Sequence, residues 1–596
     1  MVSHYLVTTA HKDTWQSEKA KLLLGKWCQT YNEKEIWAKQ DYEIVPYHWD
    51  DRQQLHDDYQ YLISDLFERL LDDATERLNK LHGVDYSVRY WRIFVGPWLG
   101  YFIMTSYDRW QMINRALNHY QVAATCKLDL KEDFATPQHQ NQFQQQITDD
   151  LWNHWFYVKV LEWLKYDSFN LTESNSCEGV RKYDKKSYKT LAIRFAKSVL
   201  KKIFSLGNYF SKNNDFFFIS SYLNPLDQAK LESNLGQIPT LMESPNLTDI
   251  GVNKKLREQF NLRLSCKNDF ERFILSIIPN LMPRYYIEGY EELKKLVKNF
   301  YWPATPKVIF TSNAIIANDF FKLWSAEKVE NGAKLLIGQH GGSYGSMRFN
   351  FNEAHEKSVS DKYITWGWQD NDSTLPLPAA KLSGAKFSFN PTGGLLLVCM
   401  TLPKYSYRLY SVPIASQVED YINDQLDFVD YLDNGVKDSL IVRLYPSDRD
   451  WKQKQRWQDR YSAVKFDSPK NNLKHSINDS RLFIGTYNST TILEVMASNI
   501  PVIMFWNPKH WELRESASMD YEKLRSVGIL HDTPKSAAEK VNSIWSNVDS
   551  WWMQDSVQEV VKDFCQKFAR TSPDYLEQWR DALKVVVKPT DKSLDG

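Results

Sequence analysis

Short apolar runs alternate with amphipathic stretches through the second half of the chain. Three runs lie between residues 307 and 368 (KVIFTSN, AKLLIGQHGG and DKYITWGW), and five lie between residues 394 and 532 (GLLLVCMT, DSLIVRLYP, RLFIGTY, IPVIMFW and GILHD). Runs of this length predict buried strands, and strands that alternate with helices build parallel sheets from right-handed βαβ units. The pattern therefore predicts an α/β protein with two Rossmann-like domains whose parallel sheets face a cleft.

The N-terminal part of the chain has a less regular pattern. HYLVTTA and EIVPYHWDDR predict two early strands, residues 57–81 have the apolar spacing of an amphipathic helix, and residues 369–393 have the Pro, Gly, Ser and Asn content of a linker. We therefore expect a first domain over residues 1–368 with a large, mostly helical insertion at about 106–300 that holds one strand near 216–220, a linker at 369–393, a second domain over 394–533, and C-terminal helices with a polar tail over 534–596.

Composition narrows the class of protein. The chain has 74 Lys and Arg against 74 Asp and Glu, so it lacks the overall positive charge that attracts nucleic acid. Its six cysteines include no CxxC pair, which suits a reducing cytoplasm, and the first residues lack the pattern of a signal peptide. The longest apolar stretch, residues 91–105, is interrupted by Arg, Gly and Pro and is too short to span a membrane. We expect a cytoplasmic protein.

The stretch RLFIGTYNSTTILEVMASNIPVIMFWNP, residues 481–508, holds the strongest candidate site. A predicted strand ends in it, and four polar residues begin the helix that follows: Asn488, Ser489, Thr490 and Thr491. Free backbone N–H groups and the helix dipole favour a phosphate at such a helix start, and hydroxyl groups add donors. Glu494, one turn later, is placed to accept from ribose hydroxyls. An ordinary capped helix is the alternative.

Two other predicted strand ends in the second domain carry cations. Arg443 ends one strand, and Lys404 and Arg408 follow another, where they can hold a phosphate or a carboxylate. The chain has neither a Walker lysine nor a GxGxxG motif, so we expect a nucleoside mono- or diphosphate donor, no resident cofactor and no metal. Asp448 and Asp450 have a DxD spacing, but a solvated turn explains it more simply.

Candidates for chemistry in the first domain gather around LLIGQHGGSYGS, residues 335–346. Ligands bind beyond the carboxyl ends of strands in open α/β sheets, so we expect His340 to face the second domain and the following glycines to let the backbone approach a substrate. Proton transfer in group transfer needs such an imidazole or a carboxylate. The catalytic candidates are His340, Glu353, Asp50 and Asp51, and the substrate-binding candidates are Gln339, Gly341, Gly342, His48, Arg89 and Arg92. A structural turn histidine and a helix cap at Asp50 and Asp51 are the alternatives.

One segment is strongly basic. Residues 181–204, from Arg181 to Phe204, contain nine Lys and Arg against one Asp, with apolar residues roughly on one face. A basic amphipathic helix of this kind lies on an anionic membrane surface. The alternative is a solvated helix that packs on its own domain.

Several stretches together resemble a bacterial family of transferases found among surface-polysaccharide genes. They include LVTTAHKDTW, VPYHWDDR, LNKLHGVDYSVRYWRIFVGPWL, GQHGGSYG, SDKYITWGW and GTYNSTTILEVMASNIPVIMFW, and they span nearly the whole chain. The second half also resembles the CMP-sugar domains of bacterial Kdo and nonulosonate transferases with the GT-B fold. In those enzymes a hydroxyl-rich helix start holds the CMP phosphate, which implies that role for Ser489, Thr490 and Thr491. Their His-Pro motif is Tyr445-Pro446 in this chain.

These features together lead to one expected function. We expect a GT-B glycosyltransferase that moves an acidic sugar from a CMP donor to a glycan or glycolipid acceptor of lipopolysaccharide or capsule, at the inner-membrane surface. A UDP-hexose transferase, a glycerophosphotransferase of the teichoic-acid type and a non-catalytic carbohydrate-binding protein are the alternatives. The presence of Arg443, the hydroxyl-rich helix start and His340 together argues against the last.

Overall fold

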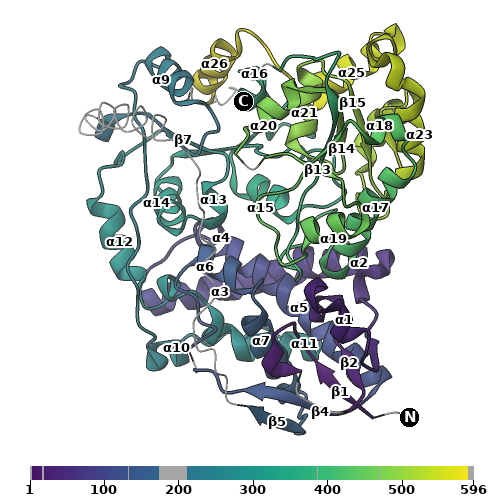
Figure 1. Ribbon diagram of the computed structural model, residues 1–596. Coiled ribbons are helices and arrows are strands. Elements are labelled where there is room, and N and C mark those ends of the chain that lie inside the picture. The colour runs from purple at the N-terminus through teal and green to yellow at the C-terminus, as the bar shows by residue number, and fades with distance from the viewer. Residues whose placement is uncertain are drawn as a thin grey trace.

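The computed structural model describes residues 3–15, 19–131, 133–172, 211–384, 387–468 and 470–587 (Figure 1). Within these residues, three β-sheets of five, five and six strands follow one another along the chain, and all their strand pairs are parallel. We call each sheet with its helices a unit. The first unit covers residues 3–172, the second 211–384 and the third 387–587.

The first unit has the strand order β3-β2-β1-β4-β5. Its longest helix, α5, is buried at every position over residues 96–110, because this stretch is apolar on nearly all sides. The strands are β1 (Ser3–Val7), β2 (Lys21–Leu23), β3 (Tyr42–Ile44), β4 (Gln121–Leu128) and β5 (Phe169–Thr172). The main helices are α2 (Arg52–Tyr59), a π-helix (Gln60–Leu66), α3 (Phe67–His82), α4 (Val88–Phe94), α5 (Gly96–His119), α6 (Gln140–Gln146) and α7 (Asp150–Trp163).

The second unit has the strand order β10-β9-β8-β7-β6, so its strands lie side by side in chain order. Its central strands β7 and β8 are buried, as expected for a parallel sheet covered by helices on both faces. The strands are β6 (Phe216–Ile219), β7 (Val308–Thr311), β8 (Lys334–Gly338), β9 (Lys362–Thr365) and β10 (Thr374–Pro376). The helices are α9 (Pro225–Asn234), α10 (Lys254–Gln259), α11 (Asp269–Leu281), α12 (Tyr290–Asn299), α13 (Ala314–Ala317), α14 (Asp319–Glu330), α15 (Phe351–Val359) and α16 (Ala380–Ser383).

The third unit has the strand order β13-β12-β11-β14-β15-β16, with the topological switch point between β11 and β14. The strands are β11 (Gly394–Val398), β12 (Leu440–Arg443), β13 (Lys465–Phe466), β14 (Ser480–Gly485), β15 (Val502–Phe505) and β16 (Leu530–His531). The helices are α17 (Val418–Asp430), α18 (Asn434–Lys437), α19 (Gln453–Arg460), α20 (Leu473–Asn478), α21 (Thr490–Ala497), α22 (Glu515–Ser526), α23 (Pro534–Ile544), α24 (Val548–Trp552), α25 (Asp555–Phe568) and α26 (Tyr575–Val587).

The second and third units together have the GT-B arrangement. The segment that follows β8 at the carboxyl edge of the second sheet contacts the start of α21, which follows β14 at the carboxyl edge of the third sheet. The last helix, α26, crosses back to the second unit and lies beside α9 (Figure 1). Its Trp579 indole N–H donates to the Pro378 carbonyl oxygen at 2.9 Å. The two Rossmann-like units are therefore joined at their carboxyl edges and again by this helix.

The first unit packs against both of the others. A Cβ atom on Gly100 of α5 would lie 1.9 Å from the ring of Phe351 at the start of α15, so this helix crossing requires glycine. On the other side, the Lys404 ammonium pairs with Asp150 of α7 at 3.1 Å, and Gln417 donates to the Trp49 carbonyl oxygen at 3.1 Å. The first unit therefore supports the place where the second and third units meet.

The predicted α/β class with parallel Rossmann-like sheets is confirmed, and the structure adds a third sheet. Strands β4 and β5 lie in the region expected to be a mostly helical insertion, and they join the early strands in a sheet of their own. The predicted linker also contains structure, since β10 pairs with β9 and α16 follows it. The single strand expected near residues 216–220 is β6.

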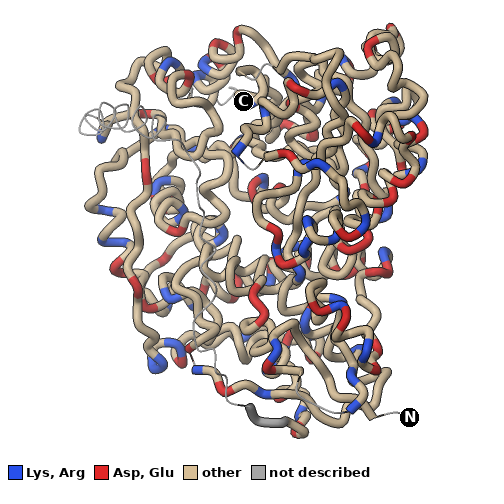
Figure 2. The backbone as a smooth tube through the Cα atoms, viewed as in Figure 1, with Lys and Arg blue, Asp and Glu red and all other residues tan. Residues whose placement is uncertain are grey.

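Charge and hydropathy follow the expectations from composition. Lys and Arg are interspersed with Asp and Glu along the visible chain (Figure 2). No helix in the part of the chain that the structure describes is long and apolar enough to cross a membrane. The basic segment 181–204 lies outside the described residues, so its placement on an anionic inner-membrane surface stays a prediction, which release of membrane-bound protein by high salt would test.

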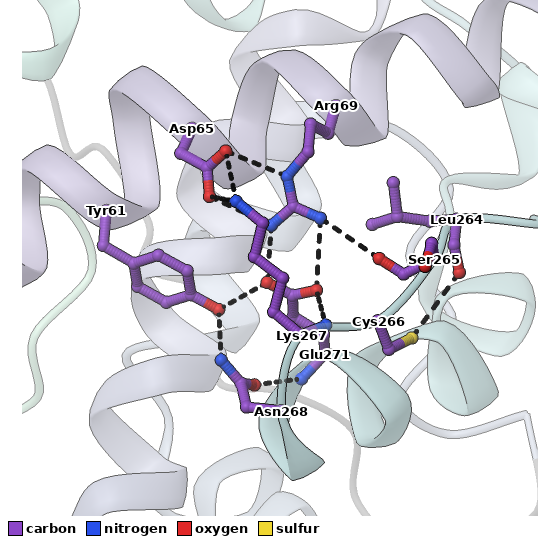
Figure 3. A network of polar contacts seen from close by, with 9 residues as sticks. All are labelled: Tyr61, Asp65, Arg69, Leu264, Ser265, Cys266, Lys267, Asn268 and Glu271. Atoms are coloured by element: carbon purple, nitrogen blue, oxygen red, sulfur yellow. Dashed lines mark hydrogen bonds and ion pairs between the residues drawn. The ribbon is translucent and has the colours of Figure 1, made fainter.

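A polar network fastens the π-helix and α3 of the first unit to the start of α11 (Figure 3). Arg69 lies between two carboxylates, those of Asp65 and the fully buried Glu271. Burial opposes ionisation of Glu271, but hydrogen bonds from Arg69, Tyr61 and the Lys267 backbone outweigh it and lower the pKa of this carboxyl. Because the pKa is lowered on folding, the network stabilises the fold at neutral pH and loses this effect as the pH falls through the folded pKa.

Removing the cation should therefore destabilise the protein. We expect Arg69→Ala to lower the free energy of unfolding by about 3 kcal/mol at pH 7, because it leaves the buried Glu271 charge without its partner. Arg272→Ala on the same helix as Glu271 is the matched control, since its pair with Asp269 is exposed and contributes less than about 1 kcal/mol. Urea unfolding of the three proteins at pH 7 checks this, and equal midpoints for both variants would contradict it.

Candidate active site

The segment between β8 and α15 is anchored at its first residue. The side-chain oxygen of Gln339 accepts from the Trp366 backbone N–H at 3.0 Å and from the Trp368 indole N–H at 2.8 Å, and its amide nitrogen donates to the Gly341 carbonyl oxygen at 2.8 Å. Gln339 is 3 % exposed. This residue, predicted to touch substrate, thus holds the turn of the following residues against the end of β9.

The same segment lies directly on the start of α21. The Gly342 backbone N–H donates to the Thr490 hydroxyl at 3.0 Å, and Asn488 donates to the Ser346 hydroxyl at 2.9 Å. A Cβ atom on Gly342 would come within 2.4 Å of the Ser489 backbone. The close approach therefore requires glycine, and it brings together the two stretches that the sequence marked separately, His340 and the hydroxyl-rich helix start.

Helix α21 begins with a hydroxyl cap, as both an anion-binding helix start and an ordinary capped helix would. Ser489 is its N-cap, with a hydroxyl that accepts from the Ile492 backbone N–H at 3.4 Å. Cap residues satisfy one of the free N–H groups of a helix start, and the remaining ones point along the axis, where the helix dipole favours negative charge. Glu494, one turn on, is 3.5 Å from the ammonium of Lys381 of α16. The seat therefore has a cation and a carboxylate beside it.

His340 is in contact with a buried acid. Its Nε2 is 3.1 Å from the Tyr344 hydroxyl, and its Nδ1 is 3.7 Å from a carboxylate oxygen of Glu356, which has no exposed surface. Tyr344 and Tyr363 both donate to Glu356, at 3.4 and 3.2 Å. His340 itself keeps 18 % of its side chain exposed, so a substrate can reach it.

The pKa values of His340 and Glu356 are shifted in opposite directions, so that the carboxyl holds its proton more strongly than the imidazole does. Burial, aided by the positive charge of Arg408, lowers the pKa of His340 to about 4. Burial raises the pKa of Glu356 well above its ordinary value, although hydrogen bonds from Tyr363 and Tyr344 oppose it. The imidazole is therefore neutral at neutral pH, and the Glu356 carboxyl holds its proton more strongly than an ordinary glutamic acid does. Adjacent groups with pKa values pushed in these directions are typical of acid and base pairs in active sites.

Aromatic rings and a cation surround the imidazole. The ring of Tyr222 stacks on the imidazole with their centroids 6.1 Å apart, and the Lys381 ammonium lies 5.7 Å from the centroid of the same tyrosine ring. On the third unit, the Arg408 guanidinium lies 4.2 Å from the ring of Tyr410 and 5.5 Å from that of Tyr407. A small cavity, with room for about one water, lies at this edge of the second sheet and is lined in part by Tyr222, Gln339 and Lys381.

Two cations predicted to bind the nucleotide are engaged elsewhere. Arg443 forms an ion pair with Asp467, next to β13, and donates to the Ser476 hydroxyl at 3.0 Å. Lys404 is 5 % exposed and pairs with Asp150 of the first unit. Both therefore hold units or strands together in this structure. Arg408, the third predicted cation, lies close enough to His340 for its charge to lower the pKa of that imidazole.

The carboxylates predicted to be catalytic each have hydrogen-bond partners within the protein. Glu353 is held by Arg514 at 2.7 Å and accepts from the Gly345 backbone N–H at 3.0 Å, so both of its oxygens are used. Asp51 caps α2 by accepting from the Gln54 backbone N–H at 3.2 Å. Asp50 accepts from Gln417 of the third unit at 2.9 Å. None of these four contacts involves His340.

The remaining candidates of the first unit make structural contacts. The guanidinium of Arg89 pairs with Asp361 at 2.8 Å, Arg92 donates to Glu68 at 2.8 Å, and His48 bonds the buried Asp108 at 3.0 Å. In the DxD stretch, Asp448 accepts from the backbone N–H groups of Lys452 and Gln453, as expected of a turn. In this structure these contacts join elements of the protein to one another, and a substrate role for Arg89, Arg92 and His48 stays a prediction.

Sequence reasoning missed two residues that the structure brings to the site. Glu356 follows Glu353 by three residues in FNEAHEKS, a spacing that puts both acids on one face of the helix that this stretch forms. Lys381 lies in the stretch taken as a linker, where no pattern distinguished it. The signal for Glu356 was present, but the spacing alone did not say which acid meets His340.

The arrangement can perform group transfer from an anionic donor. The start of α21 offers N–H groups, hydroxyls and a helix dipole to a phosphate, and Lys381 adds a positive charge beside it. His340, partly exposed and neutral, can take a proton from an attacking hydroxyl. Gly342, two residues after His340, bonds Thr490 in the first turn of α21, so the proton acceptor and the phosphate-binding groups belong to segments in direct contact.

Solved structures with some similarity to the chain are remote. HepE from Anabaena in complex with UDP has 9 % identity, and the match covers 54 % of this chain and 90 % of that one with a TM-score of 0.31. A putative UDP-N-acetylglucosamine 2-epimerase from Listeria monocytogenes has 11 % identity, 55 % and 87 % coverage and a TM-score of 0.33. WaaG, a glycosyltransferase involved in lipopolysaccharide biosynthesis, has 11 % identity, 50 % and 81 % coverage and a TM-score of 0.25. Similarity this low does not define an activity.

A family comparison covers far more of the chain. No curated protein gives a significant match to the sequence. The family described as "LIC12162 family transferase" matches residues 4–583, which includes all three units and every candidate residue discussed above. This span agrees with the whole-chain resemblance to bacterial surface-polysaccharide transferases seen in the sequence. The chain is a member of the LIC12162 family of transferases.

Proposed function

We propose that this transferase is a glycosyltransferase that uses a nucleotide-activated sugar, with the donor phosphate at the start of α21 and the reacting sugar beside His340. One observation carries the proposal: the Gly342 backbone bonds the Thr490 hydroxyl and so places a neutral, reachable imidazole next to a helix start that favours anions. The GT-B arrangement of the second and third units supports it.

The chemistry follows from these positions. An acceptor hydroxyl attacks the anomeric carbon, the bond from that carbon to the donor phosphate breaks, and the hydroxyl proton passes to the imidazole of His340. The leaving phosphate gains negative charge where the N–H groups of α21 and the Lys381 ammonium stabilise it. A bound anionic donor also favours the imidazolium, so it raises the pKa of His340 from its low value toward the working pH.

The donor class follows from the resemblance. The likeness to CMP-sugar transferases supports a CMP-linked acidic sugar as donor and a surface glycan or glycolipid as acceptor, and a UDP-hexose is the alternative donor. Titration with CMP, CDP, UDP and GDP, and with CMP-Kdo, CMP-sialic acid, UDP-glucose and CDP-glycerol, separates these classes. Tight binding of CDP-glycerol alone would favour the glycerophosphotransferase.

A charge placed in the seat tests where the phosphate binds. We expect Thr491→Glu to weaken nucleotide binding at least about 100-fold, because a carboxylate in the first turn of α21 repels the phosphate. The melting temperature should not fall, since an acid at a helix start favours the helix. Calorimetric titration with the tightest nucleotide of the panel gives the affinity.

A matched substitution controls for added charge. Ser536→Glu puts the same charge in the first turn of α23, a different helix of the third unit, whose N-cap is a threonine. This variant should keep the nucleotide affinity within about twofold of the parent. If Thr491→Glu binds the nucleotide as the parent does, the phosphate seat is not at α21. That result would overturn the proposal.

A further inference from the structure

Three units meet at the segment between β11 and α17, residues 399–414. Lys404 in this segment pairs with Asp150 of the first unit. Further along it, the Leu409 carbonyl oxygen accepts from the Phe351 backbone N–H at 3.2 Å, and the Ser411 backbone N–H donates to the Phe349 carbonyl oxygen at 3.0 Å, so the segment also pairs with the second unit. Arg408 lies between these two sets of contacts.

The surroundings of Arg408 come from every unit. Its guanidinium lies 5.5 Å from the ring of Tyr407 and 4.2 Å from that of Tyr410, both of the third unit, and the two tyrosine hydroxyls are 3.1 Å apart. Its positive charge acts on Tyr101 of α5 in the first unit and on His340 and Tyr344 in the second. The charge of Arg408 therefore affects both His340 in the second unit and Tyr101 in the first unit.

The Arg408 guanidinium has the hydroxyls of Tyr407 and Tyr410 as hydrogen-bond partners, but it has no carboxylate partner among the described residues. Its Nε is buried and makes no hydrogen bond, and no described carboxylate lies within ion-pair distance of Arg408. Other arginines of the protein have a carboxylate partner, since Arg109 pairs with Asp108 at 2.6 Å and Arg514 pairs with Glu353 at 2.7 Å. Arg408 is also partly exposed, so an anion from solution can reach a positive charge that no carboxylate neutralises.

We propose that Arg408, framed by Tyr407 and Tyr410, forms a subsite for an anionic group, a carboxylate or a phosphate, that is carried by the glycosyl unit or by the acceptor. This anion is a second one besides the donor phosphate: Arg408 lies in the segment after β11 and its charge acts on His340, whereas the donor phosphate is proposed at the start of α21, after β14. The proposal rests on the proposed function for the identity of the substrate, but the anion subsite can be tested without it. A guanidinium binds both carboxylate and phosphate through paired N–H donors.

Three small probes distinguish the possible occupants: N-acetylneuraminic acid, which carries a carboxylate, glycerol 3-phosphate, which carries a phosphate, and glucose, which is neutral. Each is titrated calorimetrically into the full-length parent and into Arg408→Gln, with and without the tightest nucleotide. We expect one of the anions to bind the parent and Arg408→Gln to weaken it about ten- to a hundredfold, with glucose binding unchanged. The anion that responds identifies the group.

Two further variants separate charge from structure. Arg408→Lys keeps the charge without the paired donors and should fall between the parent and Arg408→Gln. Arg456→Gln removes an arginine that also lies over a tyrosine ring, at 4.3 Å from that of Tyr31, but has a carboxylate partner in Glu419, so it should leave anion binding unchanged.

The outcomes also keep this proposal apart from the proposed function. Anion binding that depends on Arg408 in a protein that binds no nucleotide would support the subsite and contradict the glycosyltransferase. If neither anion binds the parent, or if Arg408→Gln binds both as the parent does while its melting temperature is unchanged, the subsite does not exist.

Discussion

Replacing His340 with alanine is expected to lower the rate of glycosyl transfer about 10²- to 10⁴-fold, the usual contribution of one general acid or base. The nucleotide affinity should stay within about twofold of the parent, because the phosphate seat is on α21 and its contact to the second unit is made by the Gly342 backbone, not by the imidazole. His340→Gln should show the same loss, since it fills the space but cannot carry the proton. Transfer, affinity and melting temperature are measured on the same preparations.

A second buried histidine provides the control for structural effects. His355 on α15 is also held neutral, with its pKa lowered to about 3 by burial, and it is 3 % exposed. His355→Ala should lower the melting temperature, with transfer falling only in proportion to the unfolded fraction. A His340→Ala protein that melts lower and transfers at the parental rate per folded molecule would show that His340 is a turn residue.

Replacing Gly342 with alanine should separate the two halves of the site. The added Cβ would lie 2.4 Å from the Ser489 backbone, so the segment and α21 must move apart by about an ångström. A displacement of this size between the proton acceptor and the phosphate seat should cost at least about 100-fold in transfer. The free energy of unfolding should fall by about 1–3 kcal/mol, which leaves the protein folded at 25 °C.

Gly435→Ala is the matched control for this change. Gly435 lies in α18 with no atom within 4 Å of its added Cβ, so this variant should keep the parental rate. If Gly342→Ala transfers as fast as the parent, the contact between His340's segment and α21 has no part in the reaction.

The apolar runs of β7, β8, β11, β14 and β15 were predictable because these strands are buried on both faces. The strands of the first sheet were harder to predict. Strands β2 and β3 have three residues each, which is too short to show the alternation of apolar and polar residues that identifies a strand. Strand β4 begins one residue after α5 ends, so the sequence shows no loop between them. The early strands were therefore assigned to the wrong sheet, and β4 and β5 were included in a helical region. Local pattern cannot show that five such strands pair with one another.

The two halves of the candidate site were found from the sequence for a different reason. Both His340 and the residues before α21 follow a strand end, where the position alone marks a site in a parallel sheet. The sequence contains no comparable signal for which residues form ion pairs with each other. Arg443 and Asp467 are 24 residues apart and Lys404 and Asp150 are 254 apart, so only the fold shows that these cations are already engaged.

The most direct test of the account is the release of nucleotide from a panel of donors (CMP-Kdo, CMP-sialic acid, UDP-glucose and UDP-N-acetylglucosamine) by the parent and His340→Ala, with binding of the same donors measured alongside. The account predicts that at least one donor binds and is turned over by the parent, and that His340→Ala binds it equally well but releases nucleotide at least 100-fold more slowly. Turnover by His340→Ala at the parental rate, or no binding of any donor to the parent, would contradict it.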